Sequence, residues 1–308
     1  IVSSITRTPV AQGGGVWGSV PATTGTDLAS IYMFEDFESQ ALGSDPEAIA
    51  GFANVTPGSV ISTDQALGGT QAYKDVSLTA GTTEWVNGFT LDIPSDLVEG
   101  DEAWLRIPVF LPIGSDLSIP TGGRLKWFRW RTETAAAANK GYSDIYYDDV
   151  NGRWEYIKET IPQPNYADAF WLTLATGVGG PFDHEYGKWV TWELYTKFSA
   201  TAGVIRMWKD GVLMADLAGV HTLDDATDLV KSMYFRTYWN GTGVPKQQDW
   251  YYDNIAMALN GAGRSDSQYL ATDAAGNRFI GLGLGAAGTA RTRIVSPEYT
   301  FTDDFEGV

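Results

Sequence analysis

Arginine and tyrosine side chains recur in this sequence within strand-like segments, and their chemistry suits a sugar ligand. An arginine fork donates paired hydrogen bonds to a carboxylate, and a tyrosine hydroxyl can both donate and accept. Such groups are suitable for binding sugar hydroxyls and uronate carboxylates. The candidate ligand-binding residues are Arg129, Arg131, Glu193, Tyr195, Lys197, Arg236 and Tyr238. The alternative is that these side chains form charge and aromatic pairs across a solvated sheet.

Acidic residues offer little sign of glycosidase chemistry. A retaining glycosidase needs two carboxylates a short distance apart, and the string Glu-x-Asp-x-x-Glu that usually delivers them along one strand is absent. Asp144, Asp148 and Asp149 precede an Asn-Gly turn. We interpret them as a solvated hairpin tip, or at most as a calcium site built from carboxylate oxygens. No other cofactor is expected.

Elimination beside a uronate carboxylate needs different groups. One group must neutralise the carboxylate, and a tyrosine, histidine or lysine must remove the adjacent proton. The candidates for this chemistry are Tyr238, Tyr195, Arg129, Arg236 and His184, with Arg131 and Lys246 as further choices. His184 and His221 are the only histidines, which excludes a three-histidine zinc site.

Composition points to a β protein outside the nucleic-acid-binding classes. The 308 residues include 12 Trp, 15 Tyr, 13 Phe and 35 Gly, and aromatic residues favour strands while glycines favour turns. The absence of cysteine excludes disulfides and thiolate metal sites. A net charge of -17 repels nucleic acid and anionic membranes. No run of about 18 apolar residues is present, so no membrane insertion is expected.

Alternating apolar residues predict strands from residue 34 to about 260. Two segments, 103–111 and 189–198, each place apolar side chains at every second position. The Asp210-Gly211 pair predicts a hairpin with a tight turn of positive φ. We expect two packed antiparallel sheets, and these six side chains should be buried: Leu105, Ile107, Val109, Val190, Trp192 and Leu194.

Both ends of the chain have a different composition. Residues 1–30 are rich in Gly, Ser, Thr and Pro, and residues 261–308 are rich in Gly, Ala and Thr. Such segments bury too little apolar surface to order themselves. We expect extended arms that contact other subunits of a homo-oligomer or larger assembly, flanking a domain of residues 31–260. The second segment could also begin a further β module.

Several strings together resemble a known fold. FEDFES, AWLRIPVFLP followed by GGRLKWFRWRT, GKWVTWELYTKFSATAGVIRMWKDGVLMAD and WYYDNIAM look like the concanavalin A-like sandwich of polysaccharide lyases, laminin-G-like modules and phage or marine surface proteins. The resemblance implies an all-β, antiparallel, two-sheet jelly roll. It also implies a ligand groove on the concave face of one sheet, where the candidate arginines and tyrosines should converge.

The activity of this fold varies, because it carries lyases, hydrolases and binders alike. The Gln-Ile-His and Tyr-Phe-Lys-Ala-Gly signatures of well-known alginate lyases are absent. The preferred hypothesis is therefore a non-enzymatic module on a virion, fibre or cell surface, thus extracellular, that could bind a glycan. One alternative is a polysaccharide lyase acting on an acidic polysaccharide. Another is a purely structural virion or filament subunit.

Overall fold

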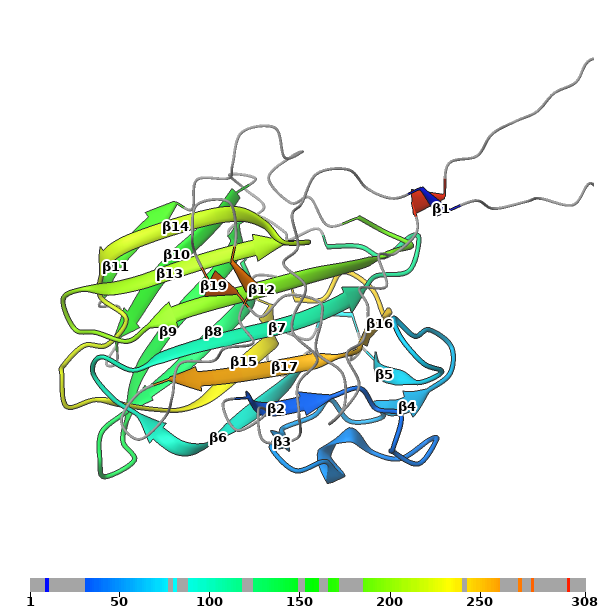
Figure 1. Ribbon diagram of the computed structural model, residues 1–308, viewed down its shortest axis with the longest axis horizontal. Helices are drawn as coiled ribbons and strands as arrows, with labels where there is room; N and C mark the ends of the chain where they lie inside the picture. The colour runs from blue at the N-terminus through cyan, green and yellow to red at the C-terminus, as the bar shows by residue number, and fades with distance from the viewer. Residues whose placement is uncertain are drawn as a thin grey trace, which may run out of the picture.

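Two antiparallel sheets stack on one another and enclose the core of the protein (Figure 1). The computed structural model describes residues 9–10, 31–76, 80–81, 88–117, 124–148, 153–160, 166–171, 185–239, 243–260, 271–272, 278–279 and 298–299. Within these ranges the helical content is one short 3-10 turn, Pro46–Ala48. No helix among the described residues is long and apolar enough to cross a membrane.

The first sheet has seven strands, and each one pairs antiparallel with its neighbours. Its central strands come from the middle of the chain, whereas the strand at one edge comes from the N-terminal part. In spatial order the strands are β11 (Tyr166–Trp171), β10 (Arg153–Thr160), β9 (Asn139–Asp148), β8 (Leu125–Glu133), β15 (Leu229–Trp239), β6 (Phe89–Leu97) and β3 (Phe52–Ala53).

The second sheet has nine strands, of which seven form one path. That path runs β14 (Val212–Val220), β13 (Gly203–Lys209), β12 (Trp189–Lys197), β7 (Glu102–Phe110), β16 (Asp249–Tyr252), β5 (Ala72–Val76) and β4 (Val60–Ser62). The other two are β17 (Ile255–Asn260), which pairs with β7, and β2 (Ile31–Glu35), which pairs with β17.

The predicted core is confirmed. All six side chains expected to be buried are at most 1% exposed. Alternation on β7 and β12 sends their apolar sets inward, where they meet a cluster of tryptophans from the other sheet. Trp127 contacts both Trp154 and Trp192, with ring centroids 5.7 and 5.9 Å apart. Aromatic pairs of this kind add to the stabilisation from burial.

The predicted hairpin is also present. Lys209 on β13 pairs with Val212 on β14, so Asp210 and Gly211 alone form the turn. Their φ angles are 48° and 78°, which is the left-handed backbone that a tight hairpin requires.

The terminal segments lie mostly outside the described residues. Two short pairs are described there: β1 (Pro9–Val10) with β20 (Glu298–Tyr299), and β18 (Ala271–Thr272) with β19 (Arg278–Phe279). The predicted contacts of residues 1–30 and 261–308 with other subunits therefore stay a prediction.

Candidate functional site

Basic and tyrosine side chains gather on the face of the seven-stranded sheet that points away from the core. We call this set the polar face. It consists of Lys126, Arg129 and Arg131 on β8, Tyr142, Asp144 and Tyr146 on β9, Glu159 on β10, and Tyr234 and Tyr238 on β15. The registers of β8, β9, β10 and β15 bring these side chains side by side.

A bulge on β8 explains why Lys126 belongs to this face. The pairing with β9 passes from Lys126 directly to Phe128, which leaves Trp127 as the extra residue. Trp127 and Phe128 are consecutive, yet both are buried in the core. The bulge therefore shifts the alternation by one position, as β-bulges do. Lys126 then points to the same side as Arg129.

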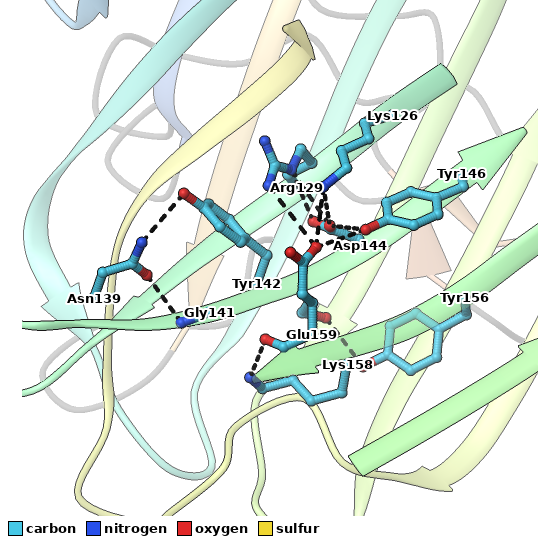
Figure 2. Close-up of polar contacts among 11 residues, drawn as sticks. Lys126, Arg129, Asn139, Gly141, Tyr142, Asp144, Tyr146, Tyr156, Lys158 and Glu159 are labelled. Atoms are coloured by element: carbon cyan, nitrogen blue, oxygen red, sulfur yellow. Dashed lines mark hydrogen bonds and ion pairs between the residues drawn. The ribbon is translucent and has the colours of Figure 1, made fainter. Parts of the chain in front are cut away.

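The centre of the polar face is a network of two cations and two carboxyl groups (Figure 2). Arg129 lies opposite Asp144, and its Nε donates to both carboxylate oxygens at 3.2 and 3.3 Å. Lys126 Nζ donates to Glu159 Oε2 at 3.0 Å. The Tyr146 hydroxyl lies 2.7 Å from Asp144 Oδ2 and 2.6 Å from Glu159 Oε2. It thus links the two ion pairs.

Other tyrosines surround the cations. The Arg129 guanidinium lies 3.8 Å from the centre of the Tyr142 ring and 5.8 Å from that of Tyr238. Lys126 Nζ lies 4.9 Å from the Tyr238 ring. Arg131 Nη1 donates to the Tyr234 hydroxyl at 3.2 Å. Cation–π contacts of this kind hold a cation near an aromatic face.

Burial and charge set the protonation of the network. Burial raises the pKa of Asp144 to about 6, although Arg129 and Lys126 oppose the rise. Burial also raises the pKa of Glu159, but Lys126, Asp144, Tyr146 and Arg129 together lower it to about 2. Burial lowers the pKa of Lys126. The two carboxyl groups are close enough to titrate as a coupled pair.

Arg236 does not reach the polar face, contrary to expectation. The pairing of β15 with β8 is irregular between Phe235 and Tyr238, and Arg236 in this interval has a φ of 53°. Its side chain turns into the core and is fully buried. There its Nη2 pairs with Asp75 Oδ2 at 2.9 Å, and its guanidinium lies against the ring of Trp250. A residue in this position cannot touch a sugar.

The predicted residues of β12 lie on the other sheet. Glu193, Tyr195 and Lys197 belong to the nine-stranded sheet and cannot share a face with Arg129. The Tyr195 hydroxyl donates to Glu102 Oε1 at 2.6 Å, and burial together with Glu102 raises the pKa of Tyr195. Of the expected groove residues, the structure thus brings together Arg129, Arg131 and Tyr238. The predicted convergence of the whole set was wrong.

The remaining candidates are dispersed. His184 and Asp149 lie outside the described residues. Lys246 is exposed and donates to the Gly114 carbonyl.

The structure places Asp144 outside the predicted calcium site, whereas Asp149 lies outside the described residues. Asp144 and Asp148 lie four residues apart on β9, about 13 Å along a strand, which is too far for one ion. Asp144 is instead bound by Arg129. Among the described residues no group of three or more acidic or histidine side chains could hold a metal ion.

Sequence reasoning missed five members of the polar face: Lys126, Tyr142, Tyr146, Glu159 and Tyr234. One signal was present, because Tyr142, Asp144 and Tyr146 alternate in the segment GYSDIYYD and must share one face of a strand. Lys126 could not be placed in this way, because the bulge beside it leaves no mark in the sequence.

Gly141 lets β9 pass close to β10 at the edge of the polar face. Its φ is 117°, and an added Cβ would clash with the carbonyl oxygen of Glu159. We expect Gly141→Ala to lower the free energy of unfolding by about 3 kcal/mol, measured by urea denaturation. The control Gly43→Ala also has a positive φ but open space around it, so a loss of about 1 kcal/mol is expected. Equal losses of stability in the two variants would show that the close approach of Gly141 to the Glu159 carbonyl contributes nothing.

Comparison with known proteins identifies the fold. No protein-family model and no curated protein matches the chain. An endo-β-1,4-glucuronan lyase from the fungus Trichoderma reesei is 15% identical, with a TM-score of 0.50, covering 76% of this chain and 98% of that one. The alginate lyase Aly36B is 20% identical, with a TM-score of 0.52, covering 77% and 98%. The alginate lyase vAL-1 from Chlorella virus is 16% identical, with a TM-score of 0.50, covering 75% and 100%.

The chain therefore has the concanavalin A-like jelly-roll sandwich that its sequence resembles. The comparisons also correct the functional hypothesis. The three solved structures named above are polysaccharide lyases, which contradicts the preferred hypothesis of a non-enzymatic surface module.

Proposed function

We propose that this protein is a lyase that cleaves a uronate-containing polysaccharide at the polar face. The observation that carries the proposal is the convergence of Lys126, Arg129 and Arg131 with four tyrosines on one sheet face. The lyase structures of similar fold support it, and a variant of Aly36B is known in complex with an alginate tetrasaccharide. The overall charge of -17 would repel an acidic polymer, so binding requires local cations such as Arg129.

The reaction needs charge neutralisation first. A base removes the proton from the ring carbon beside the carboxylate, and the electron pair forms a double bond to the next carbon. The bond from that carbon to the glycosidic oxygen breaks, and this oxygen takes up a proton. Negative charge grows on the carboxylate during the first step, and a fixed cation stabilises it. We assign this role to Arg129, assisted by Lys126.

Proton transfer needs hydroxyl groups next to these cations. Tyr142 and Tyr238 flank Arg129, and both side chains are partly exposed. Tyr146 is less suited, because burial raises its pKa well above the usual value. We propose that Tyr142 and Tyr238 serve as the base and the acid of the elimination. A polymeric substrate also supports an extracellular location, because intact polysaccharide stays outside the cell.

The test follows the unsaturated uronate ends that only a lyase creates. We expect ultraviolet absorbance to rise when the protein is incubated with alginate or glucuronan, and to stay constant with a neutral polysaccharide. Arg129→Ala should lower kcat/KM by about a hundredfold. The control Arg206→Ala removes an arginine from the nine-stranded sheet and should cleave like the wild type. Thermal unfolding would verify that both variants are folded.

If no acidic polysaccharide gives unsaturated ends, the lyase proposal fails. If cleavage occurs but Arg129→Ala cleaves as fast as the wild type, the reaction takes place elsewhere on the molecule.

A further inference from the structure

The Tyr146 hydroxyl has two carboxyl partners but only one hydrogen to donate. This hydroxyl lies within hydrogen-bond distance of Asp144 Oδ2 and of Glu159 Oε2, at 2.7 and 2.6 Å (Figure 2). A tyrosine hydroxyl carries one hydrogen, so it can donate to only one of them. The other contact is a hydrogen bond only if that carboxyl group is protonated and donates to the hydroxyl. The geometry therefore favours one proton held between Asp144 and Glu159.

The charge balance of the network depends on this proton. Lys126 and Arg129 supply two positive charges, and Asp144 and Glu159 supply two negative charges when both are ionised. The network is then neutral and offers little attraction to an acidic sugar. With one proton on the pair, one positive charge is left for a ligand.

Other charged or titratable groups also surround Asp144. The charged or titratable neighbours are Lys126 and Arg129 on β8, Tyr142 and Tyr146 on β9, Glu155, Lys158 and Glu159 on β10, and Tyr234 and Tyr238 on β15. The apolar Ile157 lies directly opposite Asp144 on β10. Lys158 pairs with Asp224 at 3.1 Å, Arg131 with Glu133 at 2.8 Å, and Arg124 with Glu155 at 3.5 Å. Because these ion pairs are each neutral, they leave the net charge of the network of Lys126, Arg129, Asp144 and Glu159 unchanged.

We propose that Asp144 and Glu159 act as a positioning pair whose shared proton frees Arg129 to bind a uronate carboxylate, so that ligand binding and proton uptake are coupled. The inference rests on the proposed uronate-binding role of the polar face, but not on cleavage. Asp144 is fully buried and would not touch the ligand itself. It acts through Arg129, which it either pairs with or releases.

The direction of the pH effect follows from the burial of Asp144. Burial raises the pKa of this carboxyl group to about 6, so it is mostly ionised at pH 7.5 and mostly protonated at pH 5. A uronate carboxylate, with an ordinary pKa of about 3.5, stays ionised over this range. Affinity for a uronate should therefore increase as the pH falls from 7.5 to 5. Binding should take up a proton within the same range.

The experiment measures binding of free D-glucuronate, which has no glycosidic bond and cannot be cleaved. We expect the dissociation constant, obtained by NMR titration, to be about tenfold smaller at pH 5 than at pH 7.5. Asp144→Asn mimics the protonated state and should bind at pH 7.5 as the wild type does at pH 5. The control Asp216→Asn removes one negative charge from the nine-stranded sheet and should keep the wild-type pH dependence.

A second readout uses the wild type alone, in case Asp144→Asn does not fold. The carbon-13 signal of the Asp144 carboxyl group reports its protonation, and saturation with glucuronate should raise its pKa. An affinity that is independent of pH, an unchanged Asp144 titration, or no glucuronate binding at any pH would each overturn the proposed coupling. pH-coupled binding without cleavage would support the coupling and contradict the lyase. Cleavage of alginate or glucuronan without pH-coupled binding would support the lyase and contradict the coupling.

Discussion

Replacing Tyr142 and Tyr238 together by phenylalanine is expected to lower kcat on a uronate polymer by about a thousandfold or more. Both hydroxyl groups lie on side chains that flank Arg129. General acid–base catalysis by a positioned side chain typically raises the reaction rate by about 10²–10⁴-fold. The rings remain, so the cation–π contacts with Arg129 and Lys126 persist. KM should therefore change much less than kcat. The measurement is the initial rate of formation of unsaturated ends over a range of polymer concentrations.

Tyr195→Phe is the matched control for this double variant. Tyr195 lies on the nine-stranded sheet and donates its hydroxyl hydrogen to Glu102, away from the polar face. Its replacement should leave kcat within about twofold of the wild type, since the hydroxyl has no part in the proposed reaction. The single variants at Tyr142 and Tyr238 then show which hydroxyl carries more of the effect. A double variant with full activity would refute the assignment of both tyrosines.

Replacing Asp75 by alanine is expected to lower the free energy of unfolding by about 3–5 kcal/mol. Asp75 and Arg236 form an ion pair with both side chains fully buried, and removal of one partner leaves a buried charge without compensation. Asp75 Oδ2 also accepts hydrogen bonds from the Gly88 backbone N–H at 2.7 Å and from the Tyr252 hydroxyl at 3.0 Å. The change would be measured by urea denaturation.

Asp64→Ala serves as the control. Asp64 pairs with Lys74 at 2.7 Å, but its side chain is 52% exposed, and exposed ion pairs contribute about 0–1 kcal/mol. The double variant Asp75→Leu with Arg236→Met removes both charges and should recover much of the loss, because apolar replacement of a buried pair is often tolerated. Failure of Asp75→Ala to destabilise more than Asp64→Ala would mean that Arg236 finds water or another partner in the core.

The sequence by itself determined the fold class and much of the core. Side chains alternate across a strand, so the apolar sets that include Leu105 and Val190 could point only to one side, and that side had to be buried. Asp210 and Gly211 tolerate the left-handed backbone, which fixed the hairpin between β13 and β14. Resemblance to concanavalin A-like domains then indicated two sheets. The buried faces of the strands and the hairpin depend on local patterns that are complete within a few residues.

Only the tertiary structure decided which residues form the candidate site. Period-two alternation places a side chain on one face of its own strand, but it does not say which sheet the strand joins, so Tyr195 was grouped with Arg129 although their sheets differ. Irregular pairing of β8 with β9 and with β15 then changes the face of the sheet to which a side chain points. It turns Arg236 into the core toward Asp75 and brings Lys126 onto the polar face, because extra residues at a bulge shift the alternation. Strand order and bulges are set by packing between distant segments, and no short stretch of sequence contains that information.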